Sequence, residues 1–171
     1  ASPYRDSCHV NEFKDPKEAC EYFVNEKVTW AAFGDSHAVE LAYALGQKLK
    51  DSNEGIKHFS FSGCRASYGK DDDFSKCAKW YNISVDFIAN EPNIQNVVFV
   101  HRYSYQLVGG TNADYPNLNG LDFNEQSVEL LQNIDRAINK LASAKQRVFV
   151  LYPVPELPDH ISKLIDRALM N

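Results

Sequence analysis

The residues in this sequence best suited to chemistry are Gly34-Asp35-Ser36-His37, which lie between an apolar run and a helical pattern. Residues 28–34 read as a buried strand, and residues 36–51 place apolar side chains at helical spacing. A serine at this junction would lie at the carboxyl end of a strand, where ligand sites form in parallel sheets. The N–H groups and positive partial charge of a helix start would stabilise an oxyanion. The pattern favours Ser36 as a nucleophile, and a helix-capping serine is the alternative interpretation.

Strand and helix patterns alternate along the whole chain. Strands are predicted at residues 28–34, 56–61 and 96–102, and a fourth strand runs into a proline-broken loop within residues 147–157. Helices are predicted at residues 15–26, 36–51, 74–92 and 159–171. A further helix starts at the capping-box-like Asp122 and Glu125 and carries Val128, Leu131, Ile134, Ile138 and Leu141 on one face. The strands are continuous apolar runs, which are typical of a parallel sheet covered on both faces. We therefore expect a three-layer α/β fold, and the absence of a linker or repeat predicts one domain over residues 1–171.

Composition and charge narrow the class of protein. The chain has 171 residues, of which 44% are hydrophobic, and a formal net charge of -5. No block of Lys and Arg is present, which argues against nucleic-acid binding because phosphates must be neutralised by clustered positive charge. No apolar run approaches the roughly 20 residues that a membrane helix needs.

The four cysteines, Cys8, Cys20, Cys64 and Cys77, fall into two local groups in short polar segments. The sequence alone cannot choose among the three possible pairings, but the short, polar, loop-like segments around each group favour pairing within it. Two disulfides would indicate an oxidising compartment such as the periplasm. The spacings lack the short Cys-x-x-Cys motif of zinc sites, so no metal or other cofactor is expected. Unpaired buried thiols are the alternative.

Several segments together resemble one known family. Gly34-Asp35-Ser36-His37-Ala38 resembles block I of the SGNH hydrolases, and most closely the periplasmic SGNH domain fused to acyltransferase-three membrane proteins. That family O-acetylates lipopolysaccharide and other surface glycans. The N-terminal cysteines and residues 62–67, 99–105 and 151–157 resemble its other blocks in the same order. The resemblance implies a flavodoxin-like SGNH hydrolase fold and the disulfides Cys8–Cys20 and Cys64–Cys77.

The resemblance also implies roles for individual residues. Ser36 would be the nucleophile, and its own N–H and that of Gly63 would donate to the oxyanion. The family has an asparagine as third donor, whereas this chain has Arg102 at the matching strand end, so Arg102 is the candidate there. The alternatives are an ion pair between Arg102 and an acid such as Asp35, and a simple turn glycine at position 63.

A catalytic serine needs a base, which the family supplies from a C-terminal Asp-x-x-His segment. None of the five histidines, His9, His37, His58, His101 and His160, has an aspartate three residues before it. His37 does not face Ser36, because neighbours on a helix point in different directions. His101 could line the cleft, and His160 is the alternative base, while His9 and His58 are expected to lie away from the site. We expect the catalytic Asp and His beyond Asn171, which would make the domain truncated at its C-terminus.

The resemblance implies an O-acetyltransferase that works through a serine acyl-enzyme. A hydroxyl of a cell-surface polysaccharide such as O-antigen would accept the acetyl group, which a fused membrane domain would supply. The alternatives are a GDSL-type carbohydrate esterase and a non-catalytic glycan-binding module with a degenerate site. Residues 104–122 read as a long loop, with Tyr105, Asn112, Tyr115 and Asn117 as candidate glycan contacts and a plain mobile loop as the alternative.

Overall fold

The computed structural model describes residues 1–23, 27–108 and 124–152, which form a mixed α/β fold built on a six-stranded sheet. Its strands are β1 (His9–Val10), β2 (Cys20–Tyr22), β3 (Lys27–Gly34), β4 (Glu54–Phe61), β5 (Asn96–Val100) and β6 (Arg147–Val150). The order is β1-β4-β3-β5-β6 with parallel neighbours, and β2 pairs antiparallel with β4. The predicted parallel core is confirmed, with one antiparallel strand added at its edge.

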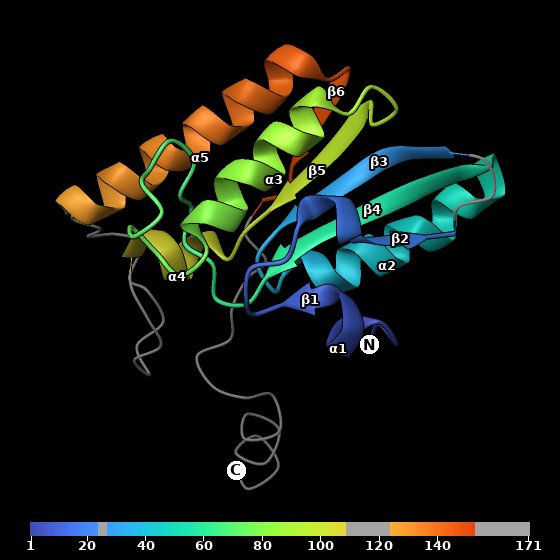
Figure 1. The fold of residues 1–171 in the computed structure, drawn as a ribbon, viewed down its shortest axis with the longest axis horizontal. Helices are drawn as coiled ribbons and strands as arrows, with labels where there is room; N and C mark the ends of the chain where they lie inside the picture. The colour runs from blue at the N-terminus through green and yellow to red at the C-terminus, as the bar shows by residue number, and fades with distance from the viewer. Residues whose placement is uncertain (24–26, 109–123, 153–171) are drawn as a thin grey trace, which may run out of the picture.

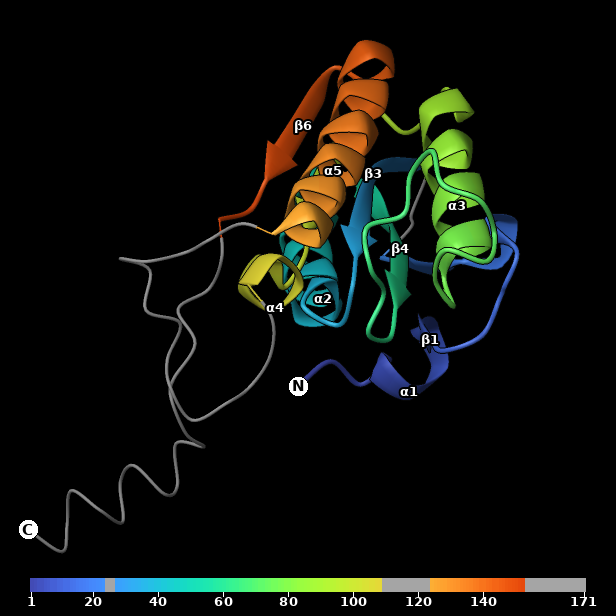
Figure 2. The same cartoon turned by 90° about the vertical axis from the view of Figure 1, so that its left-hand side faces the viewer.

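Helices cover both faces of this sheet. They are α1 (Arg5–Cys8), α2 (Ala38–Leu49), α3 (Ala78–Asn90), α4 (Tyr103–Val108) and α5 (Glu125–Ala144), with the 3-10 turns η1 (Pro16–Glu18) and η2 (Lys50–Ser52). Figures 1 and 2 show α3 and α5 side by side on one face and α2 on the other. The three-layer arrangement predicted from the alternating patterns is therefore confirmed.

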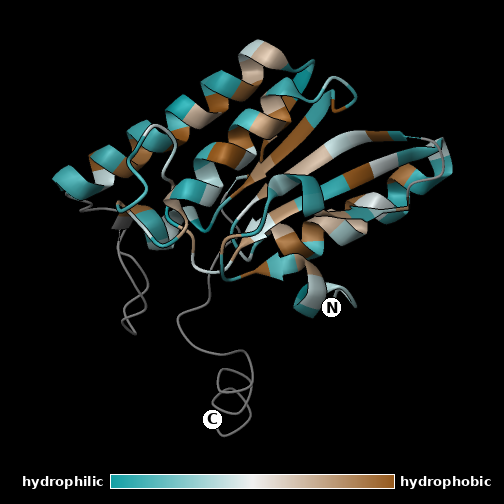
Figure 3. Ribbon diagram, in the orientation of Figure 1, coloured by the Kyte–Doolittle hydropathy of each residue, from teal (hydrophilic) through white to brown (hydrophobic). Residues whose placement is uncertain are grey.

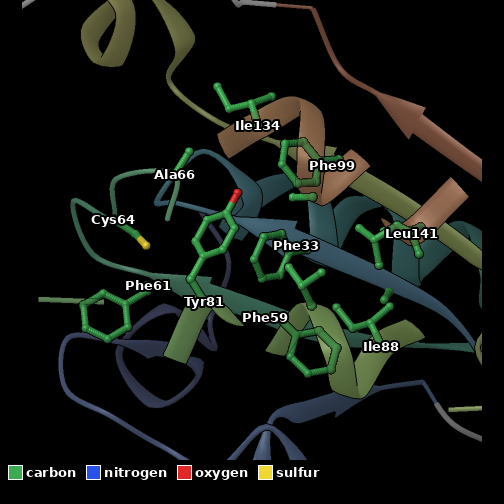
Figure 4. Close-up of a cluster of buried hydrophobic side chains, with 14 of the residues drawn as sticks. Phe33, Phe59, Phe61, Cys64, Ala66, Tyr81, Ile88, Phe99, Ile134 and Leu141 are labelled. Atoms are coloured by element: carbon green, nitrogen blue, oxygen red, sulfur yellow. The ribbon is translucent and has the colours of Figure 1, made fainter. Parts of the chain in front are cut away.

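The main core lies between the sheet and the pair α3 and α5 (Figure 4). Phe33 of β3 is its centre, because its ring stacks on Trp80 at 5.5 Å and meets Tyr81 edge-on at 4.9 Å. Alternate residues of the same strand face α2, where Ala32 packs with Ala42. Figure 3 shows the apolar colours concentrated on the central strands and polar colours on the outer side of α5. The strands are thus buried on both faces, which explains their continuous apolar sequences.

Gly34 ends β3 at a point where two backbones approach closely. It pairs with Ser60 on one side and Val100 on the other. A Cβ atom on Gly34 would overlap the carbonyl oxygen of Val100. The next residue, Asp35, donates its N–H to that same oxygen at 3.3 Å. The glycine therefore allows β3 and β5 to stay paired right up to the junction with α2.

The predicted helix over residues 15–26 is wrong over residues 15–23, and residues 24–26 lie outside the described residues. Asp15 does start a turn, because its Oδ1 accepts from the Lys17 N–H at 2.9 Å, but only one 3-10 turn forms. The chain then runs as β2, where Cys20 pairs with His58. The open edge of β4 and the disulfide to Cys8 outweigh the local helical preference, which is a weak determinant by itself.

The helix predicted after Asp122 forms as α5, but with a different start and a different buried face. Asn124 caps it, accepting from the Ser127 N–H at 2.8 Å. Ile134 and Leu141 are buried as predicted, whereas Val128 and Leu131 are 44% and 49% exposed. Leu130 and Ala137 take their places in the core, so the buried face is rotated from the one expected.

Two further predictions fall partly outside the described residues. The expected loop over 104–122 is wrong in its first part, because Tyr103–Val108 form α4. Asn112, Tyr115 and Asn117 lie outside the described residues. The strand predicted within residues 147–157 is observed as β6, which ends at Val150. The helix predicted at 159–171, with His160, lies outside the described residues.

Both disulfides are present. Cys8–Cys20 joins the end of α1 to β2, and Cys64–Cys77 joins the segment after β4 to the start of α3. All four cysteines are therefore paired, and the local pairing is confirmed.

Replacing Gly34 should lower the stability of the fold far more than replacing a glycine whose positive φ is unfavourable for other residues. We expect Gly34→Ala to lower the free energy of unfolding by about 4 kcal/mol or more, since strand pairing must give way. Gly63→Ala is the comparison: its φ is +56°, but a Cβ would have its nearest neighbour at 3.8 Å. That variant should lose about 1 kcal/mol. Urea unfolding of both variants measures this, and equal losses would contradict the close approach at Gly34.

Candidate active site

The predicted site residues lie at one edge of the sheet. Ser36, Gly63 and Arg102 each follow the carboxyl end of a strand, β3, β4 and β5 respectively. These three strands are parallel neighbours in the order β4-β3-β5, so their carboxyl ends meet at the same edge. Ligand sites in open parallel sheets form at this edge.

Ser36 is half-buried at the junction of β3 and α2. Its neighbour Asp35 makes the capping interactions, because Asp35 Oδ1 accepts from the His37 N–H at 2.9 Å and Asp35 O accepts from the Ala38 N–H at 3.0 Å. His37 occupies the N-cap position of α2, and its side chain makes no capping hydrogen bond. In the described part of the chain, no group is hydrogen-bonded to the Ser36 hydroxyl. The alternative of Ser36 as the helix cap is therefore wrong, and its hydroxyl remains available for chemistry.

Asp35 carries a buried charge behind Ser36. The residue is 4% exposed, and its Oδ2 accepts from the Arg102 N–H at 2.7 Å and from Gln106 Nε2 at 3.3 Å. Burial alone would raise the pKa of this carboxyl. The interactions with His101 and His37 and the Arg102 N–H outweigh it and hold the pKa well below its usual range. Asp35 is therefore an ionised anchor for two loops.

His101 is buried rather than exposed in a cleft. It is 2% exposed, its Nε2 lies 3.1 Å from the Tyr81 hydroxyl, and its ring stacks on Tyr81 at 5.7 Å. Its Nδ1 faces Asp35 Oδ2 at 3.7 Å. Burial raises the pKa of Tyr81 well above its ordinary value, so the phenol keeps its proton. The prediction that His101 could line the cleft is wrong, because this residue faces α3 and the core.

His37 and His58 also point elsewhere. His37 Nδ1 lies 3.4 Å from Asp35 Oδ1, close enough for electrostatic attraction but not aligned for a hydrogen bond. His58 is buried on β4 with Nδ1 2.7 Å from the Tyr22 hydroxyl. Burial raises the pKa of Tyr22 to about 12, so this hydroxyl stays protonated. Neither imidazole is placed as the base of Ser36.

His9 lies nearer to the site than its position in the sequence indicates. It pairs with Ser60 of β4, which in turn pairs with Gly34 of β3, so the three residues form one row across the sheet. Its Nδ1 is 2.8 Å from the Ser60 hydroxyl. Burial and the charge of Arg5 lower the pKa of His9, while the charge of Asp35 opposes this shift. A two-residue strand has no periodic signal, so sequence patterns could not place His9 here.

Arg102 contacts Asp35 through its backbone. The N–H makes the hydrogen bond described above, while the guanidinium carbon lies 4.9 Å from the centre of the Tyr105 ring. Gly63 is exposed and has a positive φ, as expected for a turn after β4. Donation from Gly63 and Arg102 to an oxyanion stays a prediction. Across the described residues, no group of three or more His, Cys, Asp or Glu side chains is arranged to hold a metal ion.

The match to a family model of SGNH domains makes this chain a GDSL-type member of the hydrolase and acyltransferase superfamily, and Ser36 after the carboxyl end of a central strand is consistent with it. The chain belongs to the family of SGNH domains that are fused to AT3 domains, which matches residues 7–171. The family description implies fusion to an acyltransferase-3 domain. A search of the curated proteins found no match. Over the described residues, none of the helices has the length and apolar character needed to cross a membrane.

The Asp35 anchor can be tested by removing its charge. We expect Asp35→Asn to lower the free energy of unfolding by about 3 kcal/mol, because an amide NH2 would face one of the N–H donors of His37 or Arg102. Chemical denaturation at pH 7 measures the loss. Asp51→Asn, at an exposed position in η2, is the control and should change stability little. A similar, small effect in both variants would contradict the anchor.

His58 should make stability depend on pH. Burial, followed by the charges of His9 and Arg5, lowers its pKa from 6.5 to about 4. Between these two values the unfolded chain binds more protons than the folded one, so stability falls as the pH falls. We expect His58 to account for a loss of about 2 kcal/mol between pH 7 and pH 5. Urea unfolding at both pH values should show a shallower dependence for His58→Gln, and parallel curves for the two proteins would refute the assignment.

Proposed function

We propose that this chain is the extracytoplasmic part of an O-acetyltransferase that modifies a cell-surface polysaccharide such as O-antigen. The observation that supports this most directly is the Ser36 hydroxyl at the carboxyl edge of β3, next to the start of α2 and unused in helix capping. The family's fusion to an acyltransferase-3 domain supplies a membrane partner for acetyl delivery. Two disulfides favour an oxidising compartment such as the periplasm.

The proposed reaction has two acyl-transfer steps. Ser36 Oγ attacks the carbonyl carbon of an acetyl donor and its proton passes to a base. The base gives this proton to the donor's leaving group, which departs as its bond to the acetyl carbon breaks. The polysaccharide hydroxyl then attacks the acetyl-serine, loses its proton to the same base, and Ser36 is released with its proton restored. The N–H groups of Ser36 and Gly63, with Arg102, would stabilise the oxyanion in both steps. We assign the base to the histidine of an Asp-x-x-His segment, as the family resemblance implies.

Tyr105 is the described residue that we propose as a sugar contact. Its ring is 49% exposed on α4, at the edge of the sheet where Ser36 lies. The Arg102 guanidinium stacks on this ring, which leaves the rest of the aromatic surface for an apolar face of a sugar. The ring and the guanidinium together suit a saccharide, since aromatic faces stack on sugars and guanidinium groups donate hydrogen bonds to hydroxyls.

Replacing the nucleophile tests the proposal in cells. In a strain that lacks the native gene, the full-length protein with Ser36→Ala should leave the surface polysaccharide without the acetyl groups that the wild type adds. Acetate released from purified polysaccharide by mild alkali measures this. Ser52→Ala, at an exposed position in η2, is the control and should retain wild-type acetylation. Undiminished acetylation by Ser36→Ala would reject the acyl-enzyme, and loss of acetate from pre-acetylated polysaccharide would favour an esterase.

A further inference from the structure

Gln106 of α4 is hydrogen-bonded to the segment that carries Gly63. Its Nε2 donates to the Cys64 carbonyl oxygen at 3.0 Å, and its Oε1 accepts from the Ala66 N–H at 3.0 Å. Both ends of the amide are thus bonded to backbone groups only one to three residues after Gly63. An amide bonded on both ends fixes its partner segment in orientation as well as in distance.

The same amide nitrogen is also hydrogen-bonded to the buried carboxylate of Asp35, the residue before Ser36. Gln106 Nε2 is 3.3 Å from Asp35 Oδ2 and 3.2 Å from His101 Nδ1. Asp35 itself is bonded to the His37 and Arg102 N–H groups. Gln106 therefore connects the loop after β4 with the loops after β3 and β5, which together carry the predicted nucleophile and oxyanion donors.

The loop after β4 needs such a connection. Three of its other contacts lead to α3, α5 and β1. Cys64 is bonded to Cys77 at the start of α3, the Ala66 carbonyl accepts from Asn133 of α5 at 2.8 Å, and the Ser62 N–H donates to the Val10 carbonyl of β1 at 2.8 Å. Within residues 1–23, 27–108 and 124–152, Gln106 is the side chain that is hydrogen-bonded both to this loop and to Asp35. The position of Gly63 relative to Ser36 thus depends on the pairing of β4 with β3 and, beyond the end of β4, on this amide.

We propose that Gln106 is a positioning residue that holds the Gly63 N–H at the distance from Ser36 that an oxyanion hole needs. This inference rests on the proposed function and deepens it. Gln106 acts through the backbone of Cys64 and Ala66 and does not touch the substrate. Oxyanion donors are effective only when they are held in place before the reaction, so a small displacement of the loop should slow acylation of Ser36.

Gln106→Glu is the variant that separates positioning from packing. It keeps the shape of the side chain and an acceptor for the Ala66 N–H, but places a carboxylate oxygen against Asp35 Oδ2 and the Cys64 carbonyl. The charged and titratable groups around it are Asp35, His101 and, across the Asp35 carboxylate, His37. Burial and the Asp35 charge should raise the pKa of the new carboxyl. Its protonated form at lower pH restores a donor, so the defect should shrink as the pH falls.

The experiment measures the second-order rate constant for labelling of Ser36 by a fluorophosphonate, in the full-length protein, from pH 8 to pH 5.5. We expect Gln106→Glu to react about tenfold to a hundredfold more slowly than wild type at pH 8. The ratio of variant to wild-type rate should rise toward one at pH 5.5. Gln106→Met, which has no donor at any pH, should be slow throughout. Gln47→Glu, on the exposed face of α2, is the control and should match wild type.

A second readout is the hydrolysis of p-nitrophenyl acetate, for which kcat should fall in Gln106→Glu while KM stays within about twofold. Equal labelling of variant and wild type at every pH would overturn the positioning role and leave the proposed function intact. A loss that persists at pH 5.5 and accompanies loss of the folded state would assign Gln106 a structural role and also overturn the inference. A wild-type protein that is not labelled at Ser36 would reject both the inference and the proposed function.

Discussion

The buried carboxylate of Asp35 is the interaction on which the site depends. A charge in the protein interior is stable only when it is paired and fully hydrogen-bonded. Here the backbone N–H groups of His37 and Arg102 and the amide of Gln106 satisfy it, and His101 faces it from the core. These partners belong to the β3–α2 junction and to the segment after β5, and Gln106 adds the loop after β4. One negative charge therefore joins the three segments that follow the central strands.

This arrangement explains the order of the residues in Gly34-Asp35-Ser36. Glycine at the strand end lets β3 and β5 stay paired to the last residue. Aspartate then takes over the capping of α2 and ties it to the segment after β5. Serine follows at the edge with a hydroxyl that neither the helix nor the sheet uses. The backbone holds this serine on both sides, an arrangement that the proposed acyl transfer would require of a nucleophile.

Sequence patterns predicted the sheet, its three main helices and the serine at the strand end, because long apolar runs and helical spacing are strong local signals. The patterns gave wrong predictions where long-range contacts determine the secondary structure. Cys20–Tyr22 form a strand because the edge of β4 pairs with them and because Cys20 is joined to Cys8 by a disulfide. His9 reached the edge of the site through a strand too short to show a pattern. Gln106 gave no signal, since its importance comes from partners about 40 and 70 residues away in the sequence. Local rules thus locate the serine at the strand end, whereas the hydrogen-bond network around it depends on tertiary packing.

The most direct measurement is the pH titration of the Asp35 side-chain carboxyl carbon by NMR in isotope-labelled protein. Exposed aspartates titrate with a pKa of about 3.9. The hydrogen bonds and neighbouring histidines predict that the Asp35 signal keeps the chemical shift of an ionised carboxylate from pH 7 down to the lowest pH at which the protein stays folded. A titration step at or above the pKa of the exposed aspartates would show that Asp35 is not a stabilised buried anion, and would contradict this explanation of the site.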